Sequence, residues 1–512
     1  MKKTRKVVAA LLSTVVAIGG LTGCGGGGSS STIQTNDKGE ITELVEAVQP
    51  ESGEYDPAGA AAYEYFSVQT ECYEGFVSYD EEGQIQPAAA DHWDVNDEAT
   101  EYTFYIRDDE KWSDGSDVTS ADFENTMKRA LNPDNGSWYV DFLFVIKNAQ
   151  KCFNGECDFS DVGIECIDDK TIKFTLEKPC SYFLDLCKLP TYMPSNCKYA
   201  TDDNKDWDMN PEQNLGNGPY HLSEHVDGDH VSFEKNEYYR DADKVTVLKI
   251  TDKFMDDDQA KASAYQTGEI NILQGAPSDI AESYEGKDDL RIREVPQTNY
   301  ILFNINEKPF DDVRVRQAIN YATNRQEFVD TIVEGRGEVA TSVVAKTVPG
   351  WNEDVKPYPQ DLEKAKELLA EAGYENGLDL KMYVSGEVRS RAAQVVQAQL
   401  AQVGINVDIN VYEWGAFQDA INAGEHDLLI LGWVNTTCDP AYSVTQLFHS
   451  RNCGMSGNRA YLKDDKVDEM IDAAAVETNQ EKRLQIYKDL QVRLNELCPK
   501  GLLRREHLPS IV

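Results

Sequence analysis

The feature that most constrains the fold is a regular alternation of helical and strand patterns over residues 361–433. The helical patterns cover 362–372 and 390–403, with a short third helix around 417–421, and the strand patterns cover 378–384, 405–411 and 427–433. The first two helices end at Gly373 and Gly404, where a left-handed stop is expected. The last strand, DLLILGW, is almost continuously apolar, as expected for a central parallel strand buried on both faces. Strand–helix alternation of this kind predicts a doubly wound α/β domain.

The segment 299–335 extends this pattern toward the N-terminus. Its apolar run at 300–305 predicts a buried strand, and Asp312 offers a side-chain oxygen to the start of a helix. Asn324 and Glu327 are spaced as a second capping pair, and Gly335 is placed to end that helix. One apolar helical face is expected from Val315, Ala318, Ile319 and Ala322.

Shorter motifs organise the N-terminal half. Thr119 and Asp122 form a capping box ahead of a helix. Residues 164–176 predict two strands joined across a turn, and the Asp227–Gly228 pair predicts the tip of a second hairpin.

Several motifs resemble one protein family, in that family's order. They are CYEGF at 72–76, WSDGSDVT at 112–119, NGPY at 217–220 and the run FNINEKPFDDVRVRQAINYATNR at 303–325. The chain resembles, over about 41–499, the extracellular solute-binding proteins of peptide-type ABC importers, which include oligopeptide-, dipeptide- and nickel-binding proteins. The resemblance implies an α/β, two-lobed fold of the periplasmic-binding-protein type (type II) with an additional third domain.

The resemblance also implies domain boundaries. Lobe I would be discontinuous, formed by 40–76, 181–293 and 491–512. Domain II would span 77–180, and lobe III would span 294–490. The segment 500–512, KGLLRREHLPSIV, departs from the family's closing strand. We therefore expect lost sheet pairing in lobe I and reduced stability.

The N-terminus carries a targeting signal. Residues 1–23 have a basic start and an apolar stretch too short to span a bilayer. The sequence LTGC at 21–24 resembles a bacterial lipobox, which implies that Cys24 is the lipid-modified N-terminus, and 24–39 would then be a flexible tether. The expected location is the cell membrane, lipid-anchored on its extracellular or periplasmic face.

Charge and motif content exclude several functions. A net charge of −41 repels nucleic acid. The catalytic motifs of serine hydrolases, zinc proteases and P-loop enzymes are absent from the sequence, so the chain is not expected to be an enzyme or to need a cofactor. Apart from Cys24 there are ten cysteines, whose even number permits disulfides of undetermined connectivity.

No metal site is expected either. Asp202, Asn204 and Asp206 are spaced like the start of an EF-hand, but Trp207 stands where that loop needs glycine. Three histidines lie around a predicted hairpin, whose neighbouring side chains alternate between faces and therefore do not converge. They are His221, His225 and His230.

The candidate ligand site follows the last strand, because ligands of such sheets bind beyond the carboxyl ends of strands. Trp433 and Trp414 are the predicted apolar walls, and Asn435 lies in the same loop. In peptide-binding relatives, an aspartate three residues after the tryptophan pairs with the peptide ammonium, and this chain has Thr436 there. Asp439 either replaces that aspartate or shapes a turn before Pro440.

The predicted function is that of a lipid-anchored receptor that traps a solute between two lobes and delivers it to the permease of an ABC importer. The resemblance implies oligopeptides or dipeptides and a monomeric protein. Since a hydroxyl cannot neutralise a buried ammonium, another polar solute such as a sugar remains an alternative, and so does a ligand sensor.

Overall fold

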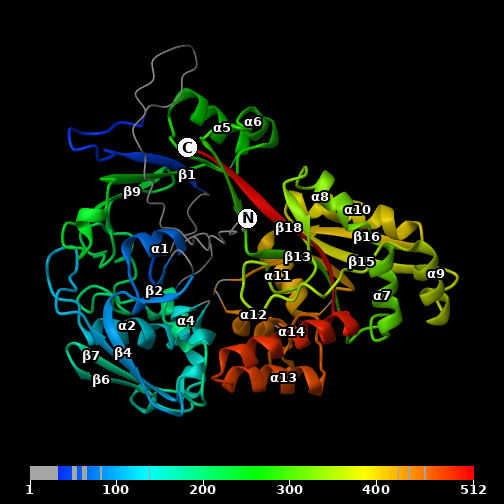
Figure 1. Cartoon of the computed structure of the whole chain (residues 1–512), viewed down its shortest axis with the longest axis horizontal. Coiled ribbons are helices and arrows are strands. Elements are labelled where there is room, and N and C mark those ends of the chain that lie inside the picture. Colours follow the sequence, from blue (N-terminus) through cyan, green and yellow to red (C-terminus); the bar gives the residue numbers. More distant parts are fainter. Residues whose placement is uncertain are drawn as a thin grey trace, which may run out of the picture. The chain divides into compact units, whose positions relative to one another are not determined.

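The computed structural model describes residues 33–48, 55–59, 66–80, 83–137, 139–255, 257–424, 426–435, 437, 439–454 and 457–512. The chain divides into two compact units, Met1–Arg291 with Pro509–Val512 and Ile292–Leu508. Both mix helices and strands, and Figure 1 labels those for which there is room. Within these described ranges, no helix is long and apolar enough to cross a membrane.

The first unit contains three sheets, with strand orders β1-β10-β9-β8, β2-β3 and β4-β5-β7-β6. Its strands are β1 (Leu44–Val48), β2 (Val77–Tyr79), β3 (Ile85–Pro87), β4 (Ala90–Val95), β5 (Glu101–Ile106), β6 (Ile164–Asp168), β7 (Thr171–Thr175), β8 (Tyr220–Val226), β9 (His230–Lys235), β10 (Lys249–Phe254) and β11 (Leu273–Gln274). Its helices are α1 (Phe66–Cys72), α2 (Ser120–Ala130), α3 (Ala149–Phe153), α4 (Phe183–Leu186), α5 (Asp258–Thr267) and α6 (Ser278–Ser283). Strand β12 (Leu290–Glu294) spans the boundary to the second unit.

The local predictions for this unit are confirmed. The Asp122 carboxylate accepts hydrogen bonds from the backbone N–H and the hydroxyl of Thr119, both at 2.9 Å, so α2 has its capping interaction. Strands β6 and β7 pair antiparallel, as do β8 and β9. The nine cysteines in the described part of the chain carry free thiols.

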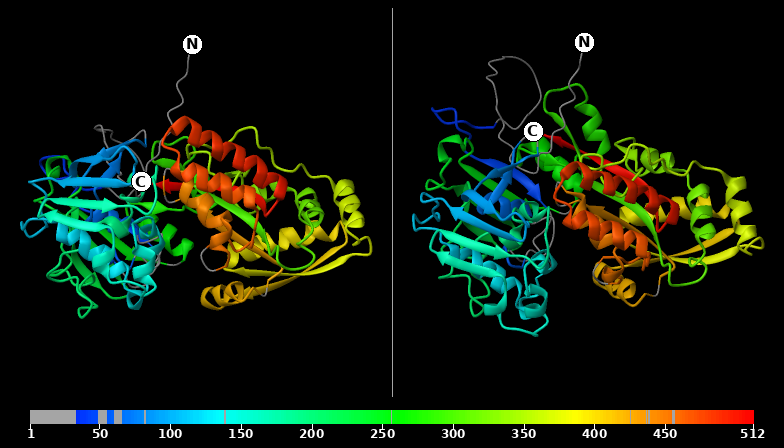
Figure 2. Two further views of the ribbon diagram at one scale, coloured as in Figure 1. Left: turned by 90° about the horizontal axis from the view of Figure 1, so that it is seen from below. Right: turned by 60° about the horizontal axis from the view of Figure 1, so that its bottom comes forward.

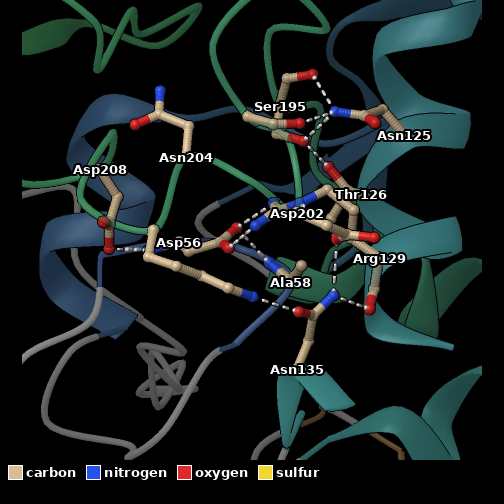
Figure 3. A network of polar contacts seen from close by, with 12 residues as sticks. Asp56, Ala58, Asn125, Thr126, Arg129, Asn135, Ser195, Asp202, Asn204 and Asp208 are labelled. Carbon is tan, nitrogen blue, oxygen red and sulfur yellow. Dashed lines mark hydrogen bonds and ion pairs between the residues drawn. The ribbon is translucent and has the colours of Figure 1, made fainter. Parts of the chain in front are cut away.

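A buried polar network connects distant segments of the first unit (Figure 3). The Arg129 guanidinium of α2 contacts both carboxylate oxygens of Asp56, at 2.9 and 2.5 Å. Asp208 accepts hydrogen bonds from the backbone N–H groups of Tyr55 and Asp56. Burial, and then the charge of Asp56, raise the pKa of Asp208 to about 7. The network therefore holds together three segments of the first unit that are far apart in sequence, around Asp56, Arg129 and Asp208.

The second unit is built on the strand order β18-β13-β17-β15-β16, with β14 beside β18. Its strands are β13 (Gln297–Phe303), β14 (Gly337–Val339), β15 (Leu378–Ser385), β16 (Ile405–Tyr412), β17 (Leu428–Val434) and β18 (Lys500–Ile511), the last of which ends in the first unit. Its helices are α7 (Val313–Ala322), α8 (Arg325–Thr331), α9 (Leu362–Glu371), α10 (Glu387–Ala401), α11 (Trp414–Asn422), α12 (Pro440–Phe448), α13 (Asp465–Val476) and α14 (Gln480–Leu497). Helices α13 and α14 lie side by side (Figure 2).

Both faces of this sheet are covered. On one face, Ile301 and Met382 pack with apolar residues of α7, α8, α9 and α10. On the other, Tyr300 and Leu429 pack with Phe417 of α11. Two buried faces explain why β17 is almost continuously apolar.

The pairing of β17 corrects one prediction. It is parallel to β15, but its longer pairing, with β13, is antiparallel over seven residue pairs. The sheet is therefore mixed. The apolar sequence of β17 records burial on both faces, which does not depend on strand direction.

The predicted cap of α8 is also wrong in its detail. Asn324 occupies the N-cap position, but its side chain makes no capping hydrogen bond. Instead, the buried amide of Gln399 in α10 accepts from the backbone N–H of Asn324 at 3.0 Å. Gln399 also donates to Glu327 at 2.7 Å. A tertiary hydrogen bond to Gln399 therefore replaces the predicted local capping interaction.

The expected loss of pairing at 500–512 is wrong. This segment is the twelve-residue strand β18, red in Figure 1, which pairs antiparallel with β13. Its last residues pair with β11 in the first unit, Ile511 opposite Leu273. Ile511 is completely buried in that unit's apolar cluster. A sequence unlike the family's closing strand therefore still completes both units.

Candidate functional site

The site begins where β17 ends, in the second unit. The half-buried Trp433 lies opposite Thr298 of β13 and packs against the apolar cluster on its face of the sheet. Its indole Nε1 donates to Ser443 Oγ of α12 at 2.9 Å. The Tyr442 ring lies 6.0 Å away, centroid to centroid. These contacts fix the orientation of the Trp433 ring.

Asn435 continues the same loop and is buried. Its backbone N–H and its side-chain Nδ2 both donate to the carbonyl oxygen of Pro296, at 2.8 and 2.9 Å. Its Oδ1 is buried without a hydrogen-bond partner among the described residues. Since a buried unpaired acceptor is costly, this oxygen is well suited to accept an N–H or O–H from a ligand.

Asp439 has a structural role. Its Oδ1 accepts from the backbone N–H of Ala441 at 2.8 Å, so it caps α12. Its Oδ2 lies 2.5 Å from Nη2 of Arg483, and both side chains are buried. A carboxylate already neutralised by arginine is a poor partner for a ligand ammonium. Of the two predicted roles, the arrangement favours the one that shapes the chain before Pro440.

Trp414 is placed differently from Trp433. It is the first residue of α11 and is 45% exposed, so it is not a core residue. The Arg389 guanidinium lies over its ring, 5.5 Å from the centroid, and the Phe417 ring packs beside it. Trp414 therefore offers an aromatic face to solvent, with a cation close by.

Gly432 leaves room for two side chains of β13 that the sequence alone did not place in the site. A Cβ at this position would lie 2.2 Å from Gln297 Nε2 and 2.9 Å from Asn299 Oδ1. The glycine therefore lets two amide side chains of β13 cross the end of β17. Only the pairing of β13 with β17 identifies them as part of the site.

Two predicted residues fall outside the described part of the chain, Thr436 and Cys24. Of the others, Trp433 and Asn435 lie together at the end of β17, Asp439 begins α12, and Trp414 begins α11. Within the described ranges, no group of three or more His, Cys, Asp or Glu side chains is placed to hold a metal ion. The chemistry available is stacking and hydrogen bonding to a bound solute.

Comparisons with known proteins show the family of the chain. The family model for bacterial extracellular solute-binding proteins, family 5, matches residues 84–454. The oligopeptide-binding protein OppA of Bacillus subtilis is 28% identical over 95% of this chain and 91% of its own length. The solved Escherichia coli murein tripeptide-binding protein MppA is 26% identical, with a TM-score of 0.79 over 92% of this chain and 94% of that one. Helicobacter pylori DppA, solved with the peptide STSA, is 25% identical, with a TM-score of 0.77 over the same shares.

Proposed function

Because the chain belongs to the bacterial extracellular solute-binding proteins of family 5, we propose that it is the lipid-anchored receptor of an ABC importer. It captures oligopeptides or dipeptides and delivers them to a membrane permease. Relatives named as oligopeptide- and dipeptide-binding proteins support this solute class.

The observation that carries the proposal is the end of β17. There Trp433 is held by Ser443, and Asn435 presents an unpaired buried oxygen. A peptide backbone supplies N–H donors at regular spacing, and the tryptophan supplies an apolar wall. Binding of this kind needs no chemical step, since affinity comes from buried contacts less the cost of ordering.

A second candidate is a polar solute that has no ammonium group. The Asp439 carboxylate is already paired with Arg483, and Thr436 stands where peptide-binding relatives have aspartate. An N-acylated peptide or a sugar derivative has no ammonium group and therefore needs no free carboxylate at either position.

Calorimetry with matched ligands tests both candidates. Trialanine, its N-acetyl form and a panel of mono- and disaccharides would be titrated into the mature protein. Saturable binding of trialanine supports peptide capture, and tighter binding of the acetylated form supports the second candidate. Failure of every peptide, together with binding of a saccharide, would reject peptide capture.

The anchor and the transport role need separate experiments. We expect Cys24→Ser to move the protein from the membrane fraction to the soluble fraction, and mass spectrometry of the wild-type N-terminus to show a diacylglyceryl modification. Deletion of the gene should abolish uptake of labelled peptide. Normal uptake with altered transcription would point instead to a sensor. Light scattering of the lipid-free protein should give a monomer.

The family and the relatives are solute-binding transport proteins, and we propose that this chain has no enzymatic activity. Recovery of unmodified peptide after prolonged incubation is the expected result. Cleavage products that scale with protein concentration would contradict it.

A further inference from the structure

Lys500, the first residue of β18, is buried without a counter-charge. It is 5% exposed, and its Nζ has no hydrogen-bond partner among the residues that the structure describes. The nitrogen lies 3.8 Å from the centroid of the Tyr300 ring and 5.0 Å from that of Phe448. Aromatic faces attract a cation, but they do not accept its three hydrogen bonds as oxygen atoms would.

The charged group that acts on Lys500 is also a cation. Arg459 acts electrostatically on both Lys500 and Tyr300, and its own Nε is buried without a hydrogen-bond partner. Burial, and then the charge of Arg459, lower the pKa of Lys500 well below its ordinary value. Among the described residues, Arg459 thus lies close enough to act on Lys500, and no carboxylate offsets it.

Lys500 also lines a cavity of the second unit. The cavity encloses about 30 Å³, more than the roughly 10–15 Å³ that one water needs by the same measure. Thr341 lines it as well, and its Oγ1 is a second buried atom without a hydrogen-bond partner in the described part of the chain. Lys500 and Thr341, each with a side-chain atom unpaired among the described residues, therefore line one small space.

A third cation strengthens the positive field there. Arg325 lines the cavity, and carbonyl oxygens of Leu502 and Tyr358 accept its hydrogen bonds at 2.7 Å each. Carbonyl dipoles satisfy the guanidinium but do not cancel its charge. The described lining contains no aspartate or glutamate, although the chain has ninety acidic residues.

We propose that this cavity binds a carboxylate group, held by Lys500 Nζ and Thr341 Oγ1. Its negative charge complements Arg325 and Arg459 and favours the protonated form of Lys500, and its oxygens accept hydrogen bonds from Lys500 and Thr341. Its size fits a small space that Phe448 and Leu502 line with apolar surface. The carboxylate is either a free small anion or part of the captured solute, and the second case rests on the proposed function.

Formate is the probe for the site itself. Thermal unfolding of the mature protein would be followed at constant ionic strength, with sodium formate replacing sodium methanesulfonate. The melting temperature should rise saturably in the wild type and in Lys466→Met, which removes an exposed cation of the same unit. It should not respond to formate in Lys500→Met. That variant removes an unpaired buried charge and keeps an apolar chain of similar length, so it should fold at least as well.

Thr341→Val provides a graded test. It removes the hydroxyl and nearly keeps the shape, so the formate concentration needed for half the effect should rise about tenfold. If Lys500→Met responds to formate as the wild type does, or if none of the proteins responds and peptide amidation has no effect, the proposal is overturned.

Matched peptides identify the source of the carboxylate. If C-terminal amidation weakens binding at least tenfold in the wild type but not in Lys500→Met, the carboxylate belongs to the captured solute. If peptides bind equally with and without amidation while formate stabilises the protein, the site holds a free anion. Formate stabilisation with no peptide binding would reject peptide capture and leave this site standing.

Discussion

Removal of the Asp439 carboxylate separates a structural role from a ligand-binding one. Asp439→Ala deletes the cap of α12 and leaves Arg483 buried and unpaired. Loss of a cap costs about 1 kcal/mol, and breaking a buried ion pair by removing one partner costs about 3–5 kcal/mol. We therefore expect a loss of about 4–6 kcal/mol in the free energy of unfolding, close to half of what a typical domain has.

A double-mutant cycle isolates the ion pair from the cap. Asp439→Asn keeps an oxygen for the Ala441 N–H and loses the charge, and Arg483→Met removes the cation while keeping an apolar stem. Each single variant should be destabilised, whereas the double variant should be more stable than the sum of the two losses predicts, by about 2 kcal/mol or more. Urea unfolding followed by tryptophan fluorescence gives all four free energies.

Two results would refute this reasoning. One is a loss below about 1 kcal/mol for Asp439→Ala, far under the cost of leaving a buried arginine unpaired. The other is an additive cycle together with a large loss of peptide affinity, which would make Asp439 a ligand contact after all.

Three further predictions follow from other parts of the chain. Ile511→Ala should lower the free energy of unfolding by about 2–4 kcal/mol through the cavity it leaves in the first unit, whereas Ser510→Ala at the neighbouring position should change it little in the same urea titration. Burial raises the pKa of Glu71 to about 8 and that of Asp208 to about 7, so the stabilisation they contribute is complete below about pH 4 and is lost as pH rises toward 8. The melting temperature should fall over that range, and Glu71→Gln should reduce the slope. Trp414→Ala should weaken solute binding at least tenfold in calorimetry while leaving the melting temperature within about a degree, because its ring is largely exposed.

The sequence predicted β15, β16 and β17 of the second unit closely, because their signals are local. Alternating apolar residues and glycine stops place β15 at Leu378–Ser385 and β16 at Ile405–Tyr412, within one residue of expectation at each end. The end of β17 was placed just as well, and with it Trp433. Period-two patterning and left-handed stops need no knowledge of distant residues.

The closing strand could not be predicted in this way. Its sequence carries charges that a pattern of apolar inside and polar outside assigns to the surface. In the structure Lys500, Arg504 and Arg505 are buried, and Arg505 donates to the carbonyl oxygens of Ser342 and Val344 at 2.9 and 2.7 Å. A buried cation takes its partners from segments far away in sequence, as Arg483 of α14 pairs with Asp439 at the start of α12. The role of Asp439 was therefore open until that contact was known.

The interior of the second unit has a charge balance opposite to that of the whole chain. The chain carries a net charge of −41, yet Arg316, Arg325 and Lys500 are buried in this unit, and backbone carbonyls accept the arginines' hydrogen bonds. Carbonyls satisfy donors without removing charge, so a positive potential persists inside. The buried carboxylate of Asp439 does not offset this charge, because it is already paired with Arg483. An anionic group on a solute gains from this field and an ammonium loses. The search for the natural solute should therefore begin with acids and N-blocked peptides.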